Sequence, residues 1–351
     1  MKILVISLAG IGDTLIATPL IHELRANFPA ATIDVLVMWS GAKDLLENNP
    51  HVSRVFQKNL LQCSKLAAVK FLWSLRREQY QLSINTHPQS RIHYRLAAWL
   101  AGANARISHE YECFTWLDRW LVTRTQAQDY SQSAVENNLN LLPLLGKDRR
   151  VAAPALEIFL TPAEKKWAED YLDKNGLLGT RWLGIHVGSG GTKNLALRRW
   201  PLANFIELTR RLHLERNLPV LFFGGPEEHS DHEKIRAALP AAIFPATKNL
   251  RQTAALIRHA HGFLSVDTAL MHIAAAMTVP AQVVIETPTW NKPIAPFGNP
   301  FTLVKNPVVD GRGLDFYRYD GGDIKGTRAE LLACMESVTV PAVFAAVTKL
   351  I

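Results

Sequence analysis

The chain has 351 residues, of which 48% are hydrophobic and 20% charged, and its formal net charge is +8 at pH 7. This composition excludes a disordered chain, and the length suffices for two domains of ordinary size. Three scattered cysteines, Cys63, Cys113 and Cys334, give neither a disulfide framework nor a metal-ligand spacing.

The positive charge favours anionic partners, such as phosphates, acidic lipids or nucleic acid, without choosing among them. The first residues lack a signal-peptide layout, and no apolar run approaches the roughly 20 residues that span a bilayer. We therefore expect a cytoplasmic protein that can touch a membrane surface without crossing it.

Strands and helices are predicted to alternate along the first half of the chain. Apolar runs predict strands at residues 3–6, 32–37, 52–56 and 82–85. Helical spacing predicts helices at residues 14–27, 41–47, 61–76 and 130–145. This alternation predicts a doubly wound α/β domain with a parallel sheet, whose ligands bind where the strands end.

The loop after the first predicted strand contains Gly10, Gly12 and Asp13. Glycines let a backbone approach a ligand closely, but the third glycine of a dinucleotide fingerprint is missing. Asp13 would repel a phosphate at this helix end, so the loop is expected to present a carboxylate. The alternative is that Asp13 only caps the helix. His87 and Arg91 follow another predicted strand and face either the same edge or solvent.

Basic and aromatic residues alternate between Lys58 and Trp99, which suits an anionic amphiphile at a membrane surface. A solvated helix face is the alternative for each residue taken singly. A linker is predicted at residues 151–155, after which Thr161, Pro162 and Glu164 mark a helix start over 162–175.

A second doubly wound sheet is predicted for the second half. Its strands are expected at residues 182–187, 219–223, 242–244, 263–266 and 281–285. Helices are expected at residues 202–212, 251–258, 327–337 and 340–350, and one more directly after Asp267 and Thr268. Residues 291–326, rich in proline and glycine, are expected to form a loop.

Three features of this half suit an anionic ligand. Gly188 to Thr192 form a glycine-rich loop, Arg198 and Arg199 precede a helix, and Asp267-Thr268 begins another helix. A carboxylate such as Glu228, just after a strand, often binds ribose. The alternatives are a basic turn at Arg198-Arg199, a dipole-favoured acid at Glu228 and an ordinary cap at Asp267.

Three motifs in order, Gly10-Ile-Gly-Asp13, the glycine loop leading to Arg198-Arg-Trp-Pro201, and Ser265 to His272, resemble glycosyltransferase family 9. This is the family of ADP-heptose:lipopolysaccharide heptosyltransferases, and the resemblance extends to about Thr289. It implies a GT-B fold of two Rossmann-like domains facing across a cleft. It also implies inverting, metal-independent transfer of a heptose from ADP-heptose to a sugar hydroxyl of the lipopolysaccharide inner core, with no cofactor.

The domains implied are residues 1–155, which bind the acceptor, and 156–326, which bind the nucleotide sugar; the helices of 327–351 are expected to pack back on the first domain. Asp13 matches the general base. The matched donor-binding residues are Gly12, Gly188, Ser189, Arg198, Glu228, Asp267, Thr268, Ala269 and His272. His87 and Arg91 are candidate acceptor contacts.

Several positions depart from the family pattern. Arg198 stands where a phosphate-binding lysine is frequent, Ala269 where glycine is usual, and Ser7 where some members have a basic residue. The C-terminal region offers residues 315–319 in place of a cysteine-rich pattern.

The expected partners are a nucleotide sugar, an anionic glycolipid acceptor and the cytoplasmic face of the inner membrane. One alternative is a GT-B transferase with another nucleotide sugar or another cell-surface glycan. Another is a nucleotide- or nucleic-acid-binding protein, but no nucleic-acid motif is evident and the basic residues are dispersed.

Overall fold

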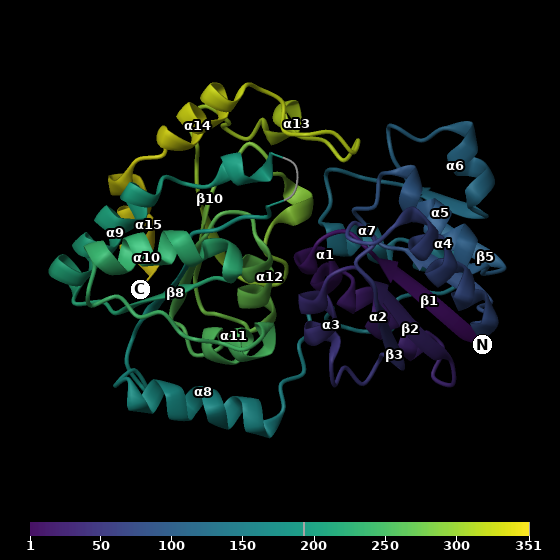
Figure 1. Ribbon diagram of the computed structural model, residues 1–351, viewed down its shortest axis with the longest axis horizontal. Helices are drawn as coiled ribbons and strands as arrows, with labels where there is room; N and C mark the ends of the chain where they lie inside the picture. Colours follow the sequence, from purple (N-terminus) through teal and green to yellow (C-terminus); the bar gives the residue numbers. More distant parts are fainter. Residues whose placement is uncertain (192–193, 351) are drawn as a thin grey trace. The chain divides into compact units, whose positions relative to one another are not determined.

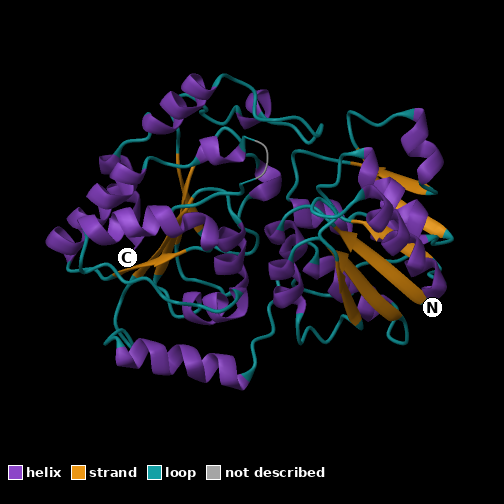
Figure 2. Cartoon of the chain, in the orientation of Figure 1, coloured by secondary structure: helices purple, strands orange, loops and turns teal. Residues whose placement is uncertain are grey.

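The computed structural model describes residues 1–191 and 194–350 and divides the chain into two compact units. The first unit is Met1–Phe159 with Tyr319–Gly321, and the second is Leu160–Arg318 with Gly322–Ile351. Each unit has a parallel sheet covered by helices (Figure 1, Figure 2).

The sheet of the first unit has the strand order β3-β2-β1-β4-β5-β6. Its strands are β1 (Lys2–Ser7), β2 (Thr32–Val37), β3 (Arg54–Gln57), β4 (Leu82–Asn85), β5 (Ala105–Glu110) and β6 (Arg124–Ala127). All pairs are parallel. The order reverses between β1 and β4, so the loops after these two strands flank the point where doubly wound sheets bind ligands.

Helices and 3-10 turns connect these strands. They are α1 (Ile11–Ile16), α2 (Thr18–Asn27), α3 (Ser40–Leu46), α4 (Lys65–Ser74), η1 (Leu75–Glu78), α5 (Ile92–Ala101), α6 (Trp116–Leu121), α7 (Ala134–Leu139) and η2 (Leu142–Leu145). Residues 3–6 of β1 are fully buried, as expected for a strand covered on both faces.

The sheet of the second unit has the order β11-β10-β9-β7-β8. Its strands are β7 (Leu183–His186), β8 (Val220–Phe223), β9 (Gly262–Ser265), β10 (Gln282–Ile285) and β11 (Phe301–Val304). Its helical elements are α8 (Pro162–Lys174), η3 (Leu195–Arg198), α9 (Leu202–Arg216), η4 (Pro226–Glu228), α10 (His229–Ala238), α11 (Leu250–Ile257), α12 (Ala269–Ala276), η5 (Lys292–Ile294), α13 (Gly313–Phe316), α14 (Arg328–Glu336) and α15 (Val340–Leu350). The order reverses between β7 and β9.

The last two helices are part of the second unit. Val343 and Val347 of α15 are fully buried in the core formed by its strands and by α9, and the Trp200 indole donates a hydrogen bond to the Val338 carbonyl at 2.8 Å. Apolar residues of these helices are thus buried in the core of the second unit, to which both helices belong. The expectation that they pack back on the first domain stays a prediction. Among the described residues, no single helix is long and apolar enough to cross a membrane; α14 and α15 reach those limits only as a pair, bent by 50°.

Several elements differ from the prediction. The first helix begins at Ile11 rather than residue 14 and is interrupted at Ala17, and the helix expected over 130–145 is divided into α7 and η2. β5, β6 and β11 were not predicted, and β11 lies within the segment expected to be loop. Residues 242–244 form only an isolated bridge, Ile243 to Leu221, rather than a strand.

Candidate active site

Asp13 lies in the first turn of α1, at the loop that follows β1. Its Oδ2 accepts a hydrogen bond from the Gly10 backbone N–H at 2.6 Å, so Asp13 does cap the start of this helix. A carboxylate offers about four acceptor positions, so a cap bond and a general-base role are chemically compatible. That role stays a prediction. Gly12, one residue before it, is buried inside the same turn.

Two tyrosines mark the surroundings of Asp13. Burial raises the pKa of the Tyr94 hydroxyl, and the negative charge of Asp13 raises it further. Burial also raises the pKa of Tyr111, again with a contribution from Asp13. The charge of Asp13 thus acts on Tyr94, in the first turn of α5, and on Tyr111, which follows β5.

His87 does not lie at the surface. It is fully buried, its backbone N–H donates to Asn138 Oδ1 at 2.7 Å, and its ring packs edge-on against Tyr319 with 4.7 Å between ring centroids. Burial, aided by His109, holds its pKa well below the ordinary histidine value. The alternative of a solvated His87 is therefore wrong. Its role as an acceptor contact stays a prediction.

Arg91 remains exposed, and its guanidinium Nε donates to the Gly321 carbonyl at 3.0 Å. Within the first unit, this hydrogen bond joins the segment Tyr319–Gly321 to the start of α5. Its role as an acceptor contact stays a prediction.

In the second unit, the loop after β7 and the turn after β9 meet at the reversal of strand order. His186 Nδ1 and Thr268 Oγ1 lie 3.1 Å apart in a hydrogen bond. Thr268 is the N-cap of α12, and its hydroxyl accepts from the Met271 N–H at 3.4 Å. The predicted strand, turn and helix around Asp267 and Thr268 are confirmed, with Ala269 as the first helical residue.

Arg198 and Asp267 form a buried ion pair at this edge. Arg198 Nη1 donates to Asp267 Oδ2 at 2.8 Å and to Thr289 Oγ1 at 3.1 Å. The Nε of Arg198 is buried without a hydrogen-bond partner among the described residues. Leaving a buried charged donor unpaired costs about 1–3 kcal/mol, which an anionic ligand oxygen could recover.

Glu228 is enclosed beside this pair. Its Oε2 accepts from the Gly225 N–H at 2.9 Å, and its Oε1 lies 3.3 Å from Arg199 Nη2. Burial alone would raise the pKa of this carboxyl, but hydrogen bonding to His186, the Gly225 N–H and the charge of Arg199 bring it below the ordinary value. Glu228 is therefore ionised and rigidly held near neutral pH.

Gly188 and Ser189, in the loop after β7, lie against Glu228 and Arg199 respectively. A Cβ on Gly188 would lie 2.1 Å from Glu228 Oε1, so only glycine fits beside the carboxylate. Ser189 is buried, and its hydroxyl donates to the Leu195 carbonyl at 3.0 Å while accepting from Arg199 Nε at 3.3 Å. Thr192, at the end of the predicted glycine loop, lies outside the described residues.

His272 lies one turn into α12 and is buried. Burial lowers its pKa to about 4, with Asp267 opposing the shift and Arg198 adding to it. Its Nδ1 has no hydrogen-bond partner among the described residues. The imidazole is therefore neutral near pH 7 and lies within electrostatic range of Arg198 and Asp267.

These residues lie where the strand order of the second sheet reverses, the place at which doubly wound sheets bind ligands, and the sequence comparison identifies the family. Residues 68–308 match glycosyltransferase family 9 (heptosyltransferase). The chain belongs to glycosyltransferase family 9. It is accordingly an enzyme that transfers a sugar.

Among curated relatives, the glycosyltransferase is 28% identical over 279 residues to lipopolysaccharide heptosyltransferase 3 of Escherichia coli, covering 77% of this chain and 78% of that one. It is 24% identical over 330 residues to lipooligosaccharide heptosyltransferase 2 of Haemophilus influenzae, covering 89% and 90% of the two chains.

Solved structures with the same fold include a family 9 glycosyl transferase from Veillonella parvula, with a TM-score of 0.76, 19% identity and coverage of 99% and 96%. Another is ADP-heptose lipopolysaccharide heptosyltransferase II of E. coli, with a TM-score of 0.69, 20% identity and coverage of 100% and 98%. These structures confirm the predicted GT-B fold class.

Most of the predicted donor residues of the glycosyltransferase lie together in the second unit, and Arg199, His186 and Thr289 contact them. Arg199 holds Glu228 and Ser189, His186 joins Thr268, and Thr289 joins the pair of Arg198 and Asp267. Arg199 stands in the predicted basic motif and His186 at the end of a predicted strand, so position was a usable signal for both. Nothing in the local sequence distinguished Thr289.

Proposed function

We propose that this glycosyltransferase moves a heptose from ADP-heptose to a sugar hydroxyl of the lipopolysaccharide inner core. Its curated relatives support this proposal, since those matched over four fifths or more of their length include named heptosyltransferases. The observation that carries the nucleotide-sugar assignment is the buried cluster of Arg198, Asp267, Glu228 and His272 at the switch point of the second sheet.

The donor diphosphate is proposed to bind Arg198 and the backbone N–H groups at the start of α12. Helix N-termini offer unpaired donors and partial positive charge to a phosphate. A phosphate oxygen would take over the donors that Arg198 now gives to Asp267 and would satisfy its unpaired Nε. The ionised Glu228 is proposed to accept hydrogen bonds from the ribose hydroxyls.

The proposed reaction is a single displacement with inversion. The acceptor hydroxyl attacks the anomeric carbon, the bond from that carbon to the ADP oxygen breaks, and the electron pair leaves with ADP. Asp13 accepts the proton of the attacking hydroxyl. Arg198 and the N–H groups of α12 stabilise the developing negative charge on ADP, so the proposed chemistry is metal-independent.

An exposed aromatic and basic strip on the first unit supports contact with a membrane surface. Trp73 of α4 and Trp120 of α6 are 52% and 59% exposed. The Arg76 guanidinium lies 3.9 Å from the centre of the Trp73 ring and 5.6 Å from that of Trp99, and Trp99 lies 5.6 Å from Trp120. Tryptophan and arginine side by side suit the headgroup layer of an anionic membrane, where a glycolipid acceptor resides.

A donor panel tests the proposal. Calorimetry with ADP, UDP and GDP should give the tightest binding with ADP, and incubation with ADP-heptose and inner-core acceptor should release ADP in proportion to the glycosylated product. Tight binding of UDP or GDP without binding of ADP would favour the alternative, a GT-B transferase that uses another nucleotide sugar.

A further inference from the structure

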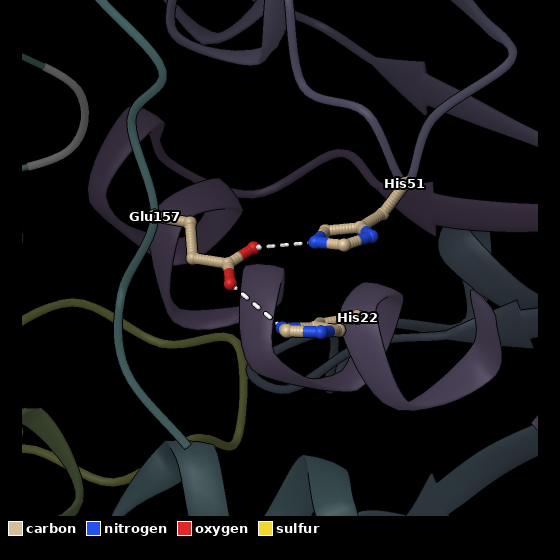
Figure 3. Close-up of side chains that lie close together, drawn as sticks. All are labelled: His22, His51 and Glu157. Atoms are coloured by element: carbon tan, nitrogen blue, oxygen red, sulfur yellow. Dashed lines mark hydrogen bonds and ion pairs between the residues drawn. The ribbon is translucent and has the colours of Figure 1, made fainter. Parts of the chain in front are cut away.

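Two histidines and a glutamate outside the proposed active site converge in the first unit (Figure 3). His22 lies on α2, His51 in the turn before β3, and Glu157 in the segment between η2 and α8. His22 Nδ1 lies 2.8 Å from Glu157 Oε1, and His51 Nε2 lies 3.6 Å from Glu157 Oε2. The two imidazole rings are stacked, with centroids 3.9 Å apart and planes inclined by 14°.

We propose that His22, His51 and Glu157 bind one divalent transition-metal ion of the zinc class. One ligand atom from each residue lies within 4.8 Å of the other two. Two ligand atoms on a tetrahedral zinc ion, each about 2.0–2.1 Å from the metal, are about 3.3 Å apart. The two observed nitrogen–oxygen separations fall on either side of that value, so small side-chain rotations suffice to bring the ligands onto an ion.

A second observation points to a cation. Glu157 Oε2 is buried and has no hydrogen-bond partner among the described residues, although it is directed toward the His51 ring. An unsatisfied carboxylate oxygen is costly in a protein interior. An ion between this oxygen and the two ring nitrogens would satisfy it.

Backbone hydrogen bonds fix the positions of two of the three ligand residues. The Glu157 N–H donates to the buried Thr18 hydroxyl at 3.0 Å, and the His51 N–H donates to Asn49 Oδ1 at 2.9 Å. Arg25 lies close and adds positive charge, which lowers affinity for a cation. Its two Nη atoms, however, donate to the carbonyls of Pro29, Ala31 and His51 and to the Ser53 hydroxyl, while its Nε has no hydrogen-bond partner among the described residues.

The donor set indicates the class of metal. Imidazole suits zinc, iron and copper, whereas calcium and magnesium prefer oxygen ligands throughout. The side chains of His22, His51 and Glu157 are 32%, 16% and 16% exposed, which leaves solvent access for a water as a further ligand. The ion would tie the segment that carries Glu157 to α2 and to the turn before β3. This is a structural role, independent of the transfer chemistry proposed above.

The test uses the full chain after treatment with EDTA. Calorimetric titration with zinc chloride should show one ion per wild-type chain, with a rise in melting temperature. His22→Ala, His51→Ala and Glu157→Gln should each weaken zinc binding by about 100-fold or more, since even residues behind metal ligands contribute 10–100-fold. His93→Ala, which removes an exposed histidine on α5, should bind like the wild type.

The absorption spectrum of bound cobalt distinguishes metal binding at this site from metal binding by the cysteines, of which Cys113 is exposed. The wild-type cobalt complex should show d–d absorption without a thiolate charge-transfer band, a result that depends on no variant folding correctly. Absence of zinc binding by the wild-type chain, a thiolate band in the cobalt spectrum, or unchanged affinity in the three ligand variants would each overturn the proposal.

Discussion

Replacing Gly188 by alanine tests whether the enclosed Glu228 carboxylate supports donor binding. The new Cβ would lie 2.1 Å from Glu228 Oε1 and 2.5 Å from its Cδ. The carboxylate must therefore retreat by about 1 Å or more to reach ordinary contact distance. Gly188 does not adopt a left-handed φ, so the effect is steric rather than a backbone strain.

The expected cost follows from the contacts that Glu228 loses. Overpacking costs about 1–3 kcal/mol, and a hydrogen bond to a charged group is worth about 1.5–3 kcal/mol. We expect a loss of about 2 kcal/mol in stability, which lowers the melting temperature of a unit of this size by about 5 °C. If Glu228 binds the ribose, a similar loss in binding weakens ADP affinity about 30-fold.

Calorimetry with ADP and a thermal melt measure the two effects, and the same loop supplies the control. A Cβ on Gly190 meets its nearest neighbours, Leu195 Cδ1 and Arg198 Nη2, at 3.7 and 3.9 Å, which are ordinary contact distances, so Gly190→Ala should leave the melting temperature unchanged. In a Glu228→Ala background the obstructing atoms are gone, and Gly188→Ala should cost little further stability. Wild-type ADP affinity and melting temperature in Gly188→Ala would refute the reasoning.

Three further predictions concern the donor site, the folding of the second unit and the membrane surface. Arg198→Ala should weaken ADP binding in calorimetry by about 10–100-fold, because a charged contact is lost. Arg198→Lys should retain part of the affinity. Arg210→Ala, which removes an exposed arginine of α9, should bind ADP like the wild type. Hydrogen bonding to the Arg251 guanidinium is the main reason that the pKa of Glu164 is lowered to about 2. Burial acts in the opposite direction, and the hydrogen bonds from the Thr161 cap lower the pKa further. This ion pair should stabilise the fold fully above the ordinary pKa of the carboxyl and lose its contribution as pH falls from about 4.5 toward 2. Glu164→Gln should therefore cost about 2 kcal/mol in urea unfolding at pH 7 and flatten the dependence on pH in that window; unchanged unfolding at pH 7 would contradict this. Trp73→Ala combined with Trp120→Ala should reduce binding to anionic vesicles in a flotation assay, while Leu214→Ala, which removes an apolar side chain that is 75% exposed on the second unit, should not.

The sequence predicted the elements that carry their own signals. Residues 3–6 of β1 form an unbroken apolar run that is fully buried, and Thr161 with Glu164 forms the predicted capping box of α8. Thr268 caps α12 as predicted. Local chemistry decides such elements, so one sequence suffices to find them.

The elements that were missed depend on distant neighbours. Arg124–Ala127 is a polar edge strand whose extended form comes from pairing with β5, and Phe301–Val304 is extended because it pairs with β10. The apolar face of α15 was visible in the sequence, but not which sheet would bury it.

The same limit applies to the site residues. His87 was placed correctly in the loop after β4, yet it is buried among distant parts of the chain, including Asn138 and Tyr319, which lies more than two hundred residues further along. Similarly, His22, His51 and Glu157 follow no metal-binding spacing and converge only in the folded chain.

The central claim is that Asp13 removes the proton of the acceptor hydroxyl while the second unit holds the nucleotide. The most direct measurement compares wild type and Asp13→Asn for product formation from ADP-heptose and for ADP affinity. Loss of a general base lowers the rate by about 10²–10⁴-fold, so we expect Asp13→Asn to form product more slowly by that factor. Its affinity for ADP should stay within about twofold of the wild type. Transfer by Asp13→Asn at the wild-type rate would contradict the claim.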